Sequence, residues 1–467
     1  MKKQIVLMGF LVIAALQACG DDYLAIVPED SITVEEFLET TEDAQMLLNG
    51  AYDALSSKNS MGGLVQLLAE LAADNFNGSF LNNNDWQAHY TWTTDIFLGT
   101  TRESWRDTYY AIGRANLLMD NFNVVEGLSD EERRRMEGEA KFIRAVGHFE
   151  MVRLFAQPYG YTSDNSHLGV PVVTTFSNEA VNRASVTQVY EQVINDLKDS
   201  EELLAETLVS GYASSWSARA YLAKVYFQMN DFENAYNYAD LVIESGLLSL
   251  EMNALNRFSL GVCSESAFEL ASFTLSDNAG EGFRDHYLPD ISTGVPKVAL
   301  SSSIYQAATA DTADLRGKNW YVAVANATGV GDLYFLAKFA VATEINVPLA
   351  HLTELKLIRA ESAAELGTNL EVAINDINDL RLRANLLTYD TNDPNTIISI
   401  ARHERRLELV GEGNRLHELK RQGVHDSPEL LIRAVAPWDC PGMVCQMPDN
   451  ELKGNPDMEP NPSGGCN

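Results

Sequence analysis

Hydrophobic positions along most of this chain recur at intervals of three and four residues, the spacing that gives an amphipathic helix one apolar face. The earliest stripe runs from Glu36 to Leu55, and a later one passes through Trp105, Tyr109 and Ile112. Similar stripes cover residues 132–156, 186–206, 215–245, 350–366, 370–385 and 395–421. Strict alternation of apolar and polar residues, the strand pattern, is scarce. The chain is therefore predicted to be mainly α-helical, with few short strands.

One segment has the spacing of a tetratricopeptide-like helical hairpin. The small residues Ala223 and Ala235 would let two antiparallel helices approach closely, while Tyr226 and Phe232 would fill the space at their turn. A weaker copy, with one residue of slippage, runs through Leu357, Ala360, Ala363, Gly367, Ala373 and Ile377. Any amphipathic hairpin would give much of this pattern, so that simpler interpretation stays open.

Two long regions between the helical stripes, residues 74–101 and 249–345, are rich in Asn, Gly, Ser, Thr and aromatic residues. Loops of this length in a compact domain are usually functional or disordered, and the density of Trp and Tyr argues against disorder. The aromatic residues of these regions include Phe76, Phe80, Trp86, Tyr90, Trp92, Tyr287, Trp320, Tyr321 and Tyr334. They are the candidate ligand-binding rings.

Rings and amides together favour a sugar ligand. A sugar presents a flat face of C–H bonds that stacks on an aromatic ring, and its hydroxyls bond to amides and carboxylates. The predicted ligand-binding set is Trp86, Tyr90, Trp92, Asn83, Asn84, Tyr287, Trp320 and Tyr321, with the three indoles as the largest stacking faces. The alternative is that part of these rings only anchor long loops to the helical scaffold.

The N-terminus has the pattern of a lipoprotein signal peptide. A basic Lys2-Lys3 start precedes an apolar run from Ile5 to Leu16, and Leu16-Gln17-Ala18-Cys19 then forms a lipobox. The run is too short to span a bilayer. We expect residues 1–18 to be removed, Cys19 to be acylated as the membrane anchor, and residues 19–34 to form a tether. An uncleaved N-terminal helix is the alternative.

The net charge and the length of the chain exclude some classes of protein. The 467 residues include 66 acidic and 34 basic side chains, for a formal net charge of −32. Such a field repels phosphates, which excludes nucleic acid as a natural partner and leaves membrane attachment to the lipid. With 46% apolar residues, the chain can bury one large core.

The cysteines point to an extracellular protein. Besides Cys19 and the isolated Cys263, three lie in the tail at Cys440, Cys445 and Cys466. Disulfides form outside the cytoplasm, and the short Cys440–Cys445 segment is predicted to close one, which leaves Cys263 and Cys466 as a possible long-range pair. No histidine lies in the tail to complete a zinc site.

No catalytic, cofactor or metal site is predicted. Two carboxylates suffice for glycoside hydrolysis, but 66 acidic residues make such pairs inevitable and therefore uninformative. The sequence has no Gly-x-Ser-x-Gly, no His-Glu-x-x-His and no phosphate-binding glycine loop. The Asp74–Gly78 and Asp390–Asp393 stretches lack the full ligand pattern of a calcium loop and are predicted turns.

Several landmarks occur together in a recognisable order. They are Trp105-x3-Tyr109-x2-Ile112-x3-Asn116, Ala140-x2-Ile143-Arg144-Ala145-x3-Phe149, Thr353 to Glu361, Glu404-Arg405-Arg406 to Arg421, and Met447-Pro448 with Asn455-Pro456. With the lipobox cysteine, this series resembles the SusD/RagB family over nearly the whole mature chain. Residues 435–446 match no landmark of the family.

The resemblance implies a single SusD-like domain, with an N-terminal helical part at 35–248 and a C-terminal part at 249–467 whose insert, 249–345, forms a ligand face. It implies a cell-surface outer-membrane lipoprotein that is not an enzyme and that passes oligosaccharides to a SusC-like TonB-dependent transporter. Peptide uptake, as in RagB-like members, and an extracellular helical scaffold that binds only protein are the alternatives.

Overall fold

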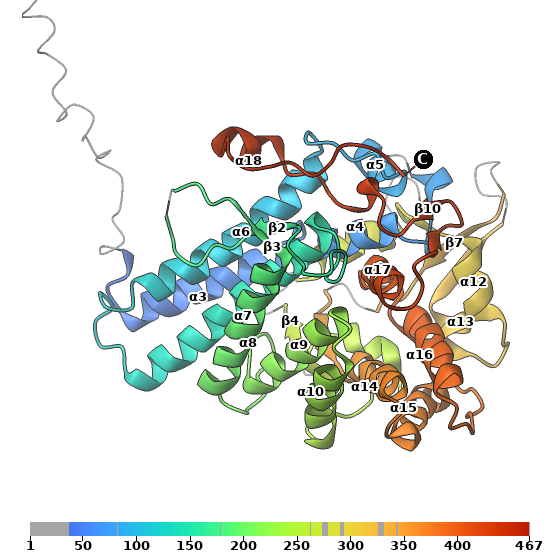
Figure 1. Cartoon of the computed structure of the whole chain (residues 1–467). Helices are drawn as coiled ribbons and strands as arrows, with labels where there is room; N and C mark the ends of the chain where they lie inside the picture. The colour runs from blue at the N-terminus through green and yellow to red at the C-terminus, as the bar shows by residue number, and fades with distance from the viewer. Residues whose placement is uncertain are drawn as a thin grey trace, which may run out of the picture.

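Helices dominate the structure, as the hydrophobic spacing predicts (Figure 1). The computed structural model describes residues 37–81, 83–177, 179–261, 263–272, 279–289, 294–325, 331–341 and 344–466. The predicted signal peptide, Cys19 and the tether lie outside the described residues. Within the described part, no helix is both long and apolar enough to cross a bilayer.

The N-terminal half is a run of helices, each packed on the next. They are α3 (Thr41–Ser56), α4 (Leu64–Ala72), α5 (Asn84–Tyr90), α6 (Gly99–Asp120), α7 (Asp130–Phe155) and α8 (Val186–Leu203). Capping boxes fix the starts of α3, α7 and α8, where the side chains of Thr40, Ser129 and Ser185 each accept a bond from the backbone three residues on. These starts are therefore encoded locally.

The predicted helical hairpins are present. They pair α9 (Ser215–Gln228) with α10 (Phe232–Glu244), and α14 (Leu352–Leu366) with α15 (Leu370–Arg383). Ala223 and Ala235 are fully buried where the first pair meets, as expected for close helix contact. Tyr226 stacks on Tyr238 at 5.7 Å between ring centroids. In Figure 1 these hairpins lie at the lower edge of the molecule, away from α5 and the C-terminal segment.

The stripe predicted over 395–421 is two helices, α16 (Pro394–Glu408) and α17 (Arg415–His425). The connection contains Gly411 and Gly413, both with φ of +81°, a conformation that favours glycine. A Cβ at Gly413 would lie 2.6 Å from the Cα of Gln66 on α4. The break is therefore required by close packing of the connection against α4.

The two regions without helical periodicity contain short elements. The 249–345 insert holds η3 (Ala254–Phe258), α11 (Glu281–Tyr287), α12 (Ser302–Thr309) and α13 (Leu315–Asn319), and the earlier region holds η2 (Gly78–Phe80). One antiparallel sheet has the order β1 (Phe76–Asn77), β5 (Ala299–Leu300), β7 (Leu333–Leu336) and β6 (Tyr321–Val324). The pairing of Phe76 with Leu300 joins the two regions.

The remaining short strands form two-stranded pairs. They are β2 (Leu168–Pro171) with β3 (Arg183–Ser185), β4 (Ser266–Leu270) with β8 (Val347–His351), and β9 (Leu431–Ile432) with β10 (Ala436–Pro437). Two further short helices, η5 (Pro441–Met443) and α18 (Asp449–Gly454), lie in the C-terminal segment.

A buried carboxylate at the end of α16 ties the insert to the helical hairpins. Glu408 is fully buried and lies 3.5 Å from Arg257 of η3, 3.1 Å from Arg316 of α13 and 2.8 Å from Arg383 of α15. These guanidinium groups hold the pKa of Glu408 at about 2, against the desolvation that would raise it. The charged residues of α16 therefore serve the scaffold through this cluster.

A second carboxylate extends the cluster. Glu412 pairs with Lys338, which follows β7, and its other oxygen lies 3.0 Å from His351 Nε2 at the end of β8. These neighbours lower the pKa of Glu412 strongly. We call Arg257, Arg316, Lys338, His351, Arg383, Glu408 and Glu412 the buried charge cluster.

The cluster predicts a pH-dependent stability. Because the folded-state pKa of Glu408 is depressed, its contribution is present above 4.5 and is lost as the pH falls towards about 2. Glu408→Gln removes the carboxylate that three buried guanidinium groups share, although each keeps another acidic partner, so we expect a loss of about 3 kcal/mol at pH 7 and a shallower pH profile. Urea unfolding at several pH values measures both.

The control is Glu281→Gln, which removes the exposed Lys58–Glu281 pair and should cost less than about 1 kcal/mol. Equal losses in the two variants would contradict a special role for the cluster.

Candidate ligand-binding site

Most of the predicted rings are buried. The exposed fractions are 6% for Trp86, 6% for Trp92, 3% for Trp320, 2% for Tyr287 and 7% for Tyr321. Rings this enclosed offer no face to a sugar. The expectation that these five rings form an exposed stacking platform is therefore wrong.

The first region is buried because α5 folds onto the scaffold beneath it. Trp86 meets the His286 ring edge-on at 5.2 Å, and the Trp92 indole N–H donates to the Ala72 carbonyl at the end of α4. Tyr287 packs against Phe76 with 6.0 Å between centroids. These rings thus anchor the loops, which is the alternative left open by the sequence.

The rings of the second region have similar roles. Trp320 lies under the Lys338 ammonium, 4.9 Å from its ring centroid. It lines a hollow of about 430 Å³, whose other lining residues include Arg383 and Glu408. These two already pair with each other, so the hollow offers no free charge. Tyr321 meets the edge of Tyr305.

Three predicted residues remain accessible around α5. Tyr90, the last residue of α5, is partly exposed, and Asn83 and Asn84 are exposed at its start. The side-chain Oδ1 of Asn83 accepts from the backbone N–H groups of Asp85 and Trp86, which fixes the start of the helix. Accessible amide groups therefore lie at one end of α5 and an accessible ring at the other.

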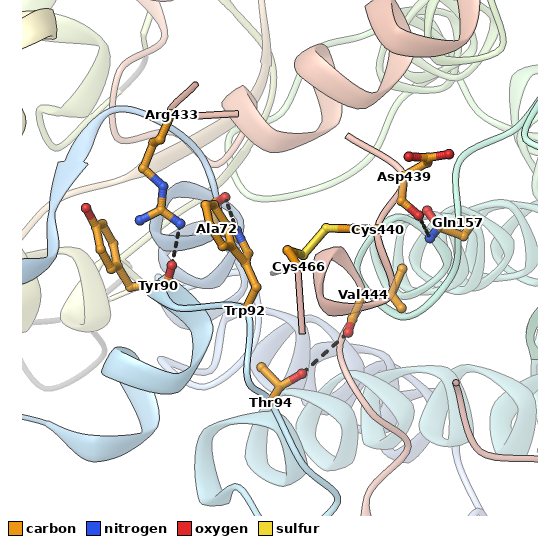
Figure 2. Close-up of a disulfide and its surroundings, with 10 residues drawn as sticks. All are labelled: Ala72, Tyr90, Trp92, Thr94, Gln157, Arg433, Asp439, Cys440, Val444 and Cys466. Atoms are coloured by element: carbon orange, nitrogen blue, oxygen red, sulfur yellow. Dashed lines mark hydrogen bonds between the residues drawn. A yellow bond between two sulfur atoms is a disulfide. The ribbon is translucent and has the colours of Figure 1, made fainter. Parts of the chain in front are cut away.

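An arginine from the C-terminal part of the chain lies against the end of α5. Arg433 reaches from the turn between β9 and β10, and its Cζ lies 3.7 Å from the ring centroids of both Tyr90 and Trp92 (Figure 2). It also donates to the Tyr90 carbonyl. Asn83, Asn84, Tyr90, Trp92 and Arg433 are called the α5 corner from here on.

The guanidinium group of Arg433 has donors to spare. Among the described residues no carboxylate forms an ion pair with it, although the chain has 66 acidic side chains, and its Nε lacks a hydrogen-bond partner. Burial lowers the pKa of Arg433. That Nε is itself enclosed, but the Arg433 side chain as a whole is only partly buried, so its remaining guanidinium donors can meet a ligand acceptor beside the partly exposed Tyr90 ring.

Backbone conformation marks the same place. Trp92, Arg433 and Ala434 have φ values of 58°, 53° and 57°, the left-handed region that non-glycine residues rarely adopt. Each such residue costs on the order of 1 kcal/mol and persists only where the surroundings hold it, as at ligand clamps. Sequence reasoning missed Arg433 because its partners lie about 340 positions away and no local spacing links them.

Comparison with known proteins identifies the family. One family model, described as "Starch-binding associating with outer membrane", matches residues 22–227, and another, described as "SusD family", matches residues 305–455. The chain belongs to the SusD/RagB family. SusD-like protein P2 of Formosa agariphila is 25% identical over an alignment that covers 88% of this chain and 89% of that protein.

Solved structures of the family share the fold. A SusD superfamily protein from Bacteroides thetaiotaomicron is 26% identical and has a TM-score of 0.79, with 91% of this chain and 100% of that chain covered. A laminarin-binding SusD-like protein is 21% identical with a TM-score of 0.71, over 91% and 100% of the two chains. The latter similarity concerns the fold alone.

The disulfide of this SusD/RagB chain is not the predicted one. Cys440 pairs with Cys466, while Cys445 and Cys263 are buried free thiols. The Cys445 backbone N–H bonds to the Leu154 carbonyl, and its Sγ lies 3.9 Å from His89 Nδ1. The C-terminus folds back to meet Cys440, a long-range event that spacing between Cys440 and Cys445 does not reveal.

The disulfide lies beside the α5 corner (Figure 2). A Cβ at Gly442 would lie 2.3 Å from the Trp92 carbonyl oxygen and 3.0 Å from Cys466 Sγ. The loop that follows Cys440 thus passes directly against Trp92. The bridge holds two C-terminal loops against the corner.

Peptide mapping without reduction tests the pairing. We expect a cross-linked Cys440–Cys466 peptide and an unmodified Cys445 that reacts with alkylating agent only after denaturation. Cys466→Ser should cost about 3 kcal/mol, because the bridge closes a loop across 26 positions, whereas Cys445→Ser should leave the cross-link intact. A Cys440–Cys445 cross-link would contradict the structure.

Proposed function

We propose that this SusD/RagB protein is a non-catalytic cell-surface lipoprotein that binds a glycan at the α5 corner. It would then deliver the glycan to a SusC-like TonB-dependent transporter of the outer membrane. The main supporting observation is Arg433, a partly exposed arginine that two aromatic rings hold in place and that forms no ion pair with a carboxylate among the described residues.

The chemistry of the corner suits a sugar. The partly exposed Tyr90 ring supplies a stacking surface, and the Asn84 amide and the Arg433 guanidinium supply donors for hydroxyl oxygens. The matching family model is described by starch binding, and one solved relative is named for laminarin binding. A peptide is the alternative ligand, because its carbonyl oxygens would accept hydrogen bonds from the same donors. The binding experiment must therefore distinguish a glycan from a peptide.

The membrane attachment rests on the N-terminus. The lipobox ending at Cys19 and the family description that associates such proteins with the outer membrane support a lipid-anchored surface location. Family membership supports a SusC-like partner. The parts of the chain at 35–248 and 249–467 are proposed to act as one body, because the pairing of Phe76 with Leu300 joins them.

Affinity electrophoresis against starch, laminarin, xylan and a casein hydrolysate control tests the binding site. Arg433→Ala and Tyr90→Ala should each weaken retardation by the retained glycan roughly tenfold, since each removes about 1–2 kcal/mol of contact. Arg433→Lys should not restore binding, because lysine keeps the charge but loses the planar stack.

The matched control is Arg133→Ala, which removes another arginine that lies over a ring, Phe122, at the start of α7. Unchanged retardation of both corner variants would contradict the site. Shortened products after prolonged incubation with the retained glycan would contradict the non-catalytic assignment.

Metabolic labelling with palmitate tests the anchor. The wild-type chain should incorporate label and co-purify with an outer-membrane barrel protein, whereas Cys19→Ala should lose both the label and the surface exposure to added protease. Cys263→Ala, a buried thiol, is the control and should keep the label. Label that persists in Cys19→Ala would contradict the lipobox assignment.

A further inference from the structure

A second hollow lies between α6, the segment after β2, and α18, and it is separate from the α5 corner. Its volume is about 460 Å³, within the range of roughly 300–1,000 Å³ that is typical of small-ligand sites. In Figure 1, α18 and α5 both lie along the upper edge of the molecule, opposite the helical hairpins. We call this hollow the α6–α18 groove.

Aromatic residues of α6 form one wall. Trp105 and Tyr109 pack together at 4.5 Å between centroids, and the Tyr109 hydroxyl donates to the Pro171 carbonyl. Tyr110 comes next in the helix and therefore points about 100° away. It is 57% exposed and has no ring partner among the described residues. The packed rings of Trp105 and Tyr109 thus form the fixed part of the wall. The exposed Tyr110 ring is the part on which a ligand can stack.

Polar groups from two other segments face the groove. Asn450 and Glu451 of α18 line it, and the Asn450 amide donates to a Glu451 carboxylate oxygen at 2.8 Å. Burial raises the pKa of Glu451, and hydrogen bonding from the Trp105 side chain opposes that rise. Glu179, from the segment after β2, adds a second carboxylate. Carboxylates placed beside an open ring are suited to accept hydroxyl donors.

The charge balance restricts the ligand class. Two carboxylates line the groove, and its one guanidinium, Arg106, already donates to Asp107 at 2.7 Å. A uronate or sulfate group would therefore meet net repulsion, because the two carboxylates of the groove and Asp107 outweigh the positive charge of Arg106. An uncharged ligand that is rich in hydroxyls and has a flat apolar face meets no such barrier.

We propose that the α6–α18 groove is a second saccharide site that takes neutral sugars. Tyr110 stacks on the sugar ring, and Glu451 and Glu179 accept its hydroxyls. The site is argued from its own residues and does not depend on the α5 corner.

Hydrogen–deuterium exchange measured by mass spectrometry tests the groove directly. The full chain is incubated in turn with maltohexaose, laminarihexaose and xylohexaose at millimolar concentration. We expect at least one of them to slow exchange in peptides that cover residues 171–181 and 449–455. Tyr110→Ala should weaken that protection roughly tenfold in apparent Kd, because a stacked ring is lost.

Two variants make the result specific. Tyr110→Phe keeps the ring and should keep the protection. Tyr389→Ala removes another exposed tyrosine, on the connection between α15 and α16, and should change nothing in the groove. Glu451→Gln retains the shape of the side chain but should weaken binding, since the neutral amide accepts hydroxyl bonds less strongly than a carboxylate.

The outcomes separate this inference from the proposed function. Protection confined to residues 83–93 and 430–438 would overturn the groove and leave the α5 corner standing. Protection at neither place by any of the three sugars would overturn both. Protection of the groove by a lysine-rich peptide but by none of the sugars would overturn the saccharide assignment.

Discussion

The enclosed carboxylate of Glu408 is the constraint on which the rest of the structure depends. Three guanidinium groups, from η3, α13 and α15, converge on one side chain at the end of α16. A buried carboxylate without such partners would be protonated or expelled, and the three guanidinium groups would lose the one partner that they share. The insert is thus fixed to the helical hairpins by charge as well as by apolar contact, and its short strands can hold a defined position.

A well-fixed insert can support strained backbone conformations at the α5 corner. The β1–β5 pairing fixes the region around α5 to the insert, and the Cys440–Cys466 bridge holds the C-terminal loops beside the α5 corner. Between these supports, Arg433 can remain in a left-handed conformation with its guanidinium between two rings. An arginine so placed is preorganised, because the entropy of ordering its long side chain is lost on folding and not on ligand binding.

The sequence predicted the features that depend on residues close together in the chain. It did not predict the features that depend on contacts between residues far apart in the chain. The helices and the α9–α10 hairpin follow from three- and four-residue spacing, with caps such as Ser129 fixing their starts. The break at Gly413 was missed because contact with α4 imposes it. Trp86 and Trp320 were expected at the surface because no helical stripe contains them, but burial of a loop residue depends on what folds over it. Arg433 and the partner of Cys440 were hidden for the same reason.

The central claim is that the ligand binds at the α5 corner through the Tyr90 ring and the Arg433 guanidinium, and does not stack on the buried indoles of Trp86, Trp92 and Trp320. The most direct measurement is a crystal structure with an oligosaccharide of the retained glycan. The account predicts a sugar unit against Tyr90 with a hydroxyl within hydrogen-bond distance of the Arg433 guanidinium. A sugar seated at a buried-indole loop that has opened, with the Tyr90–Arg433 corner unoccupied, would contradict it.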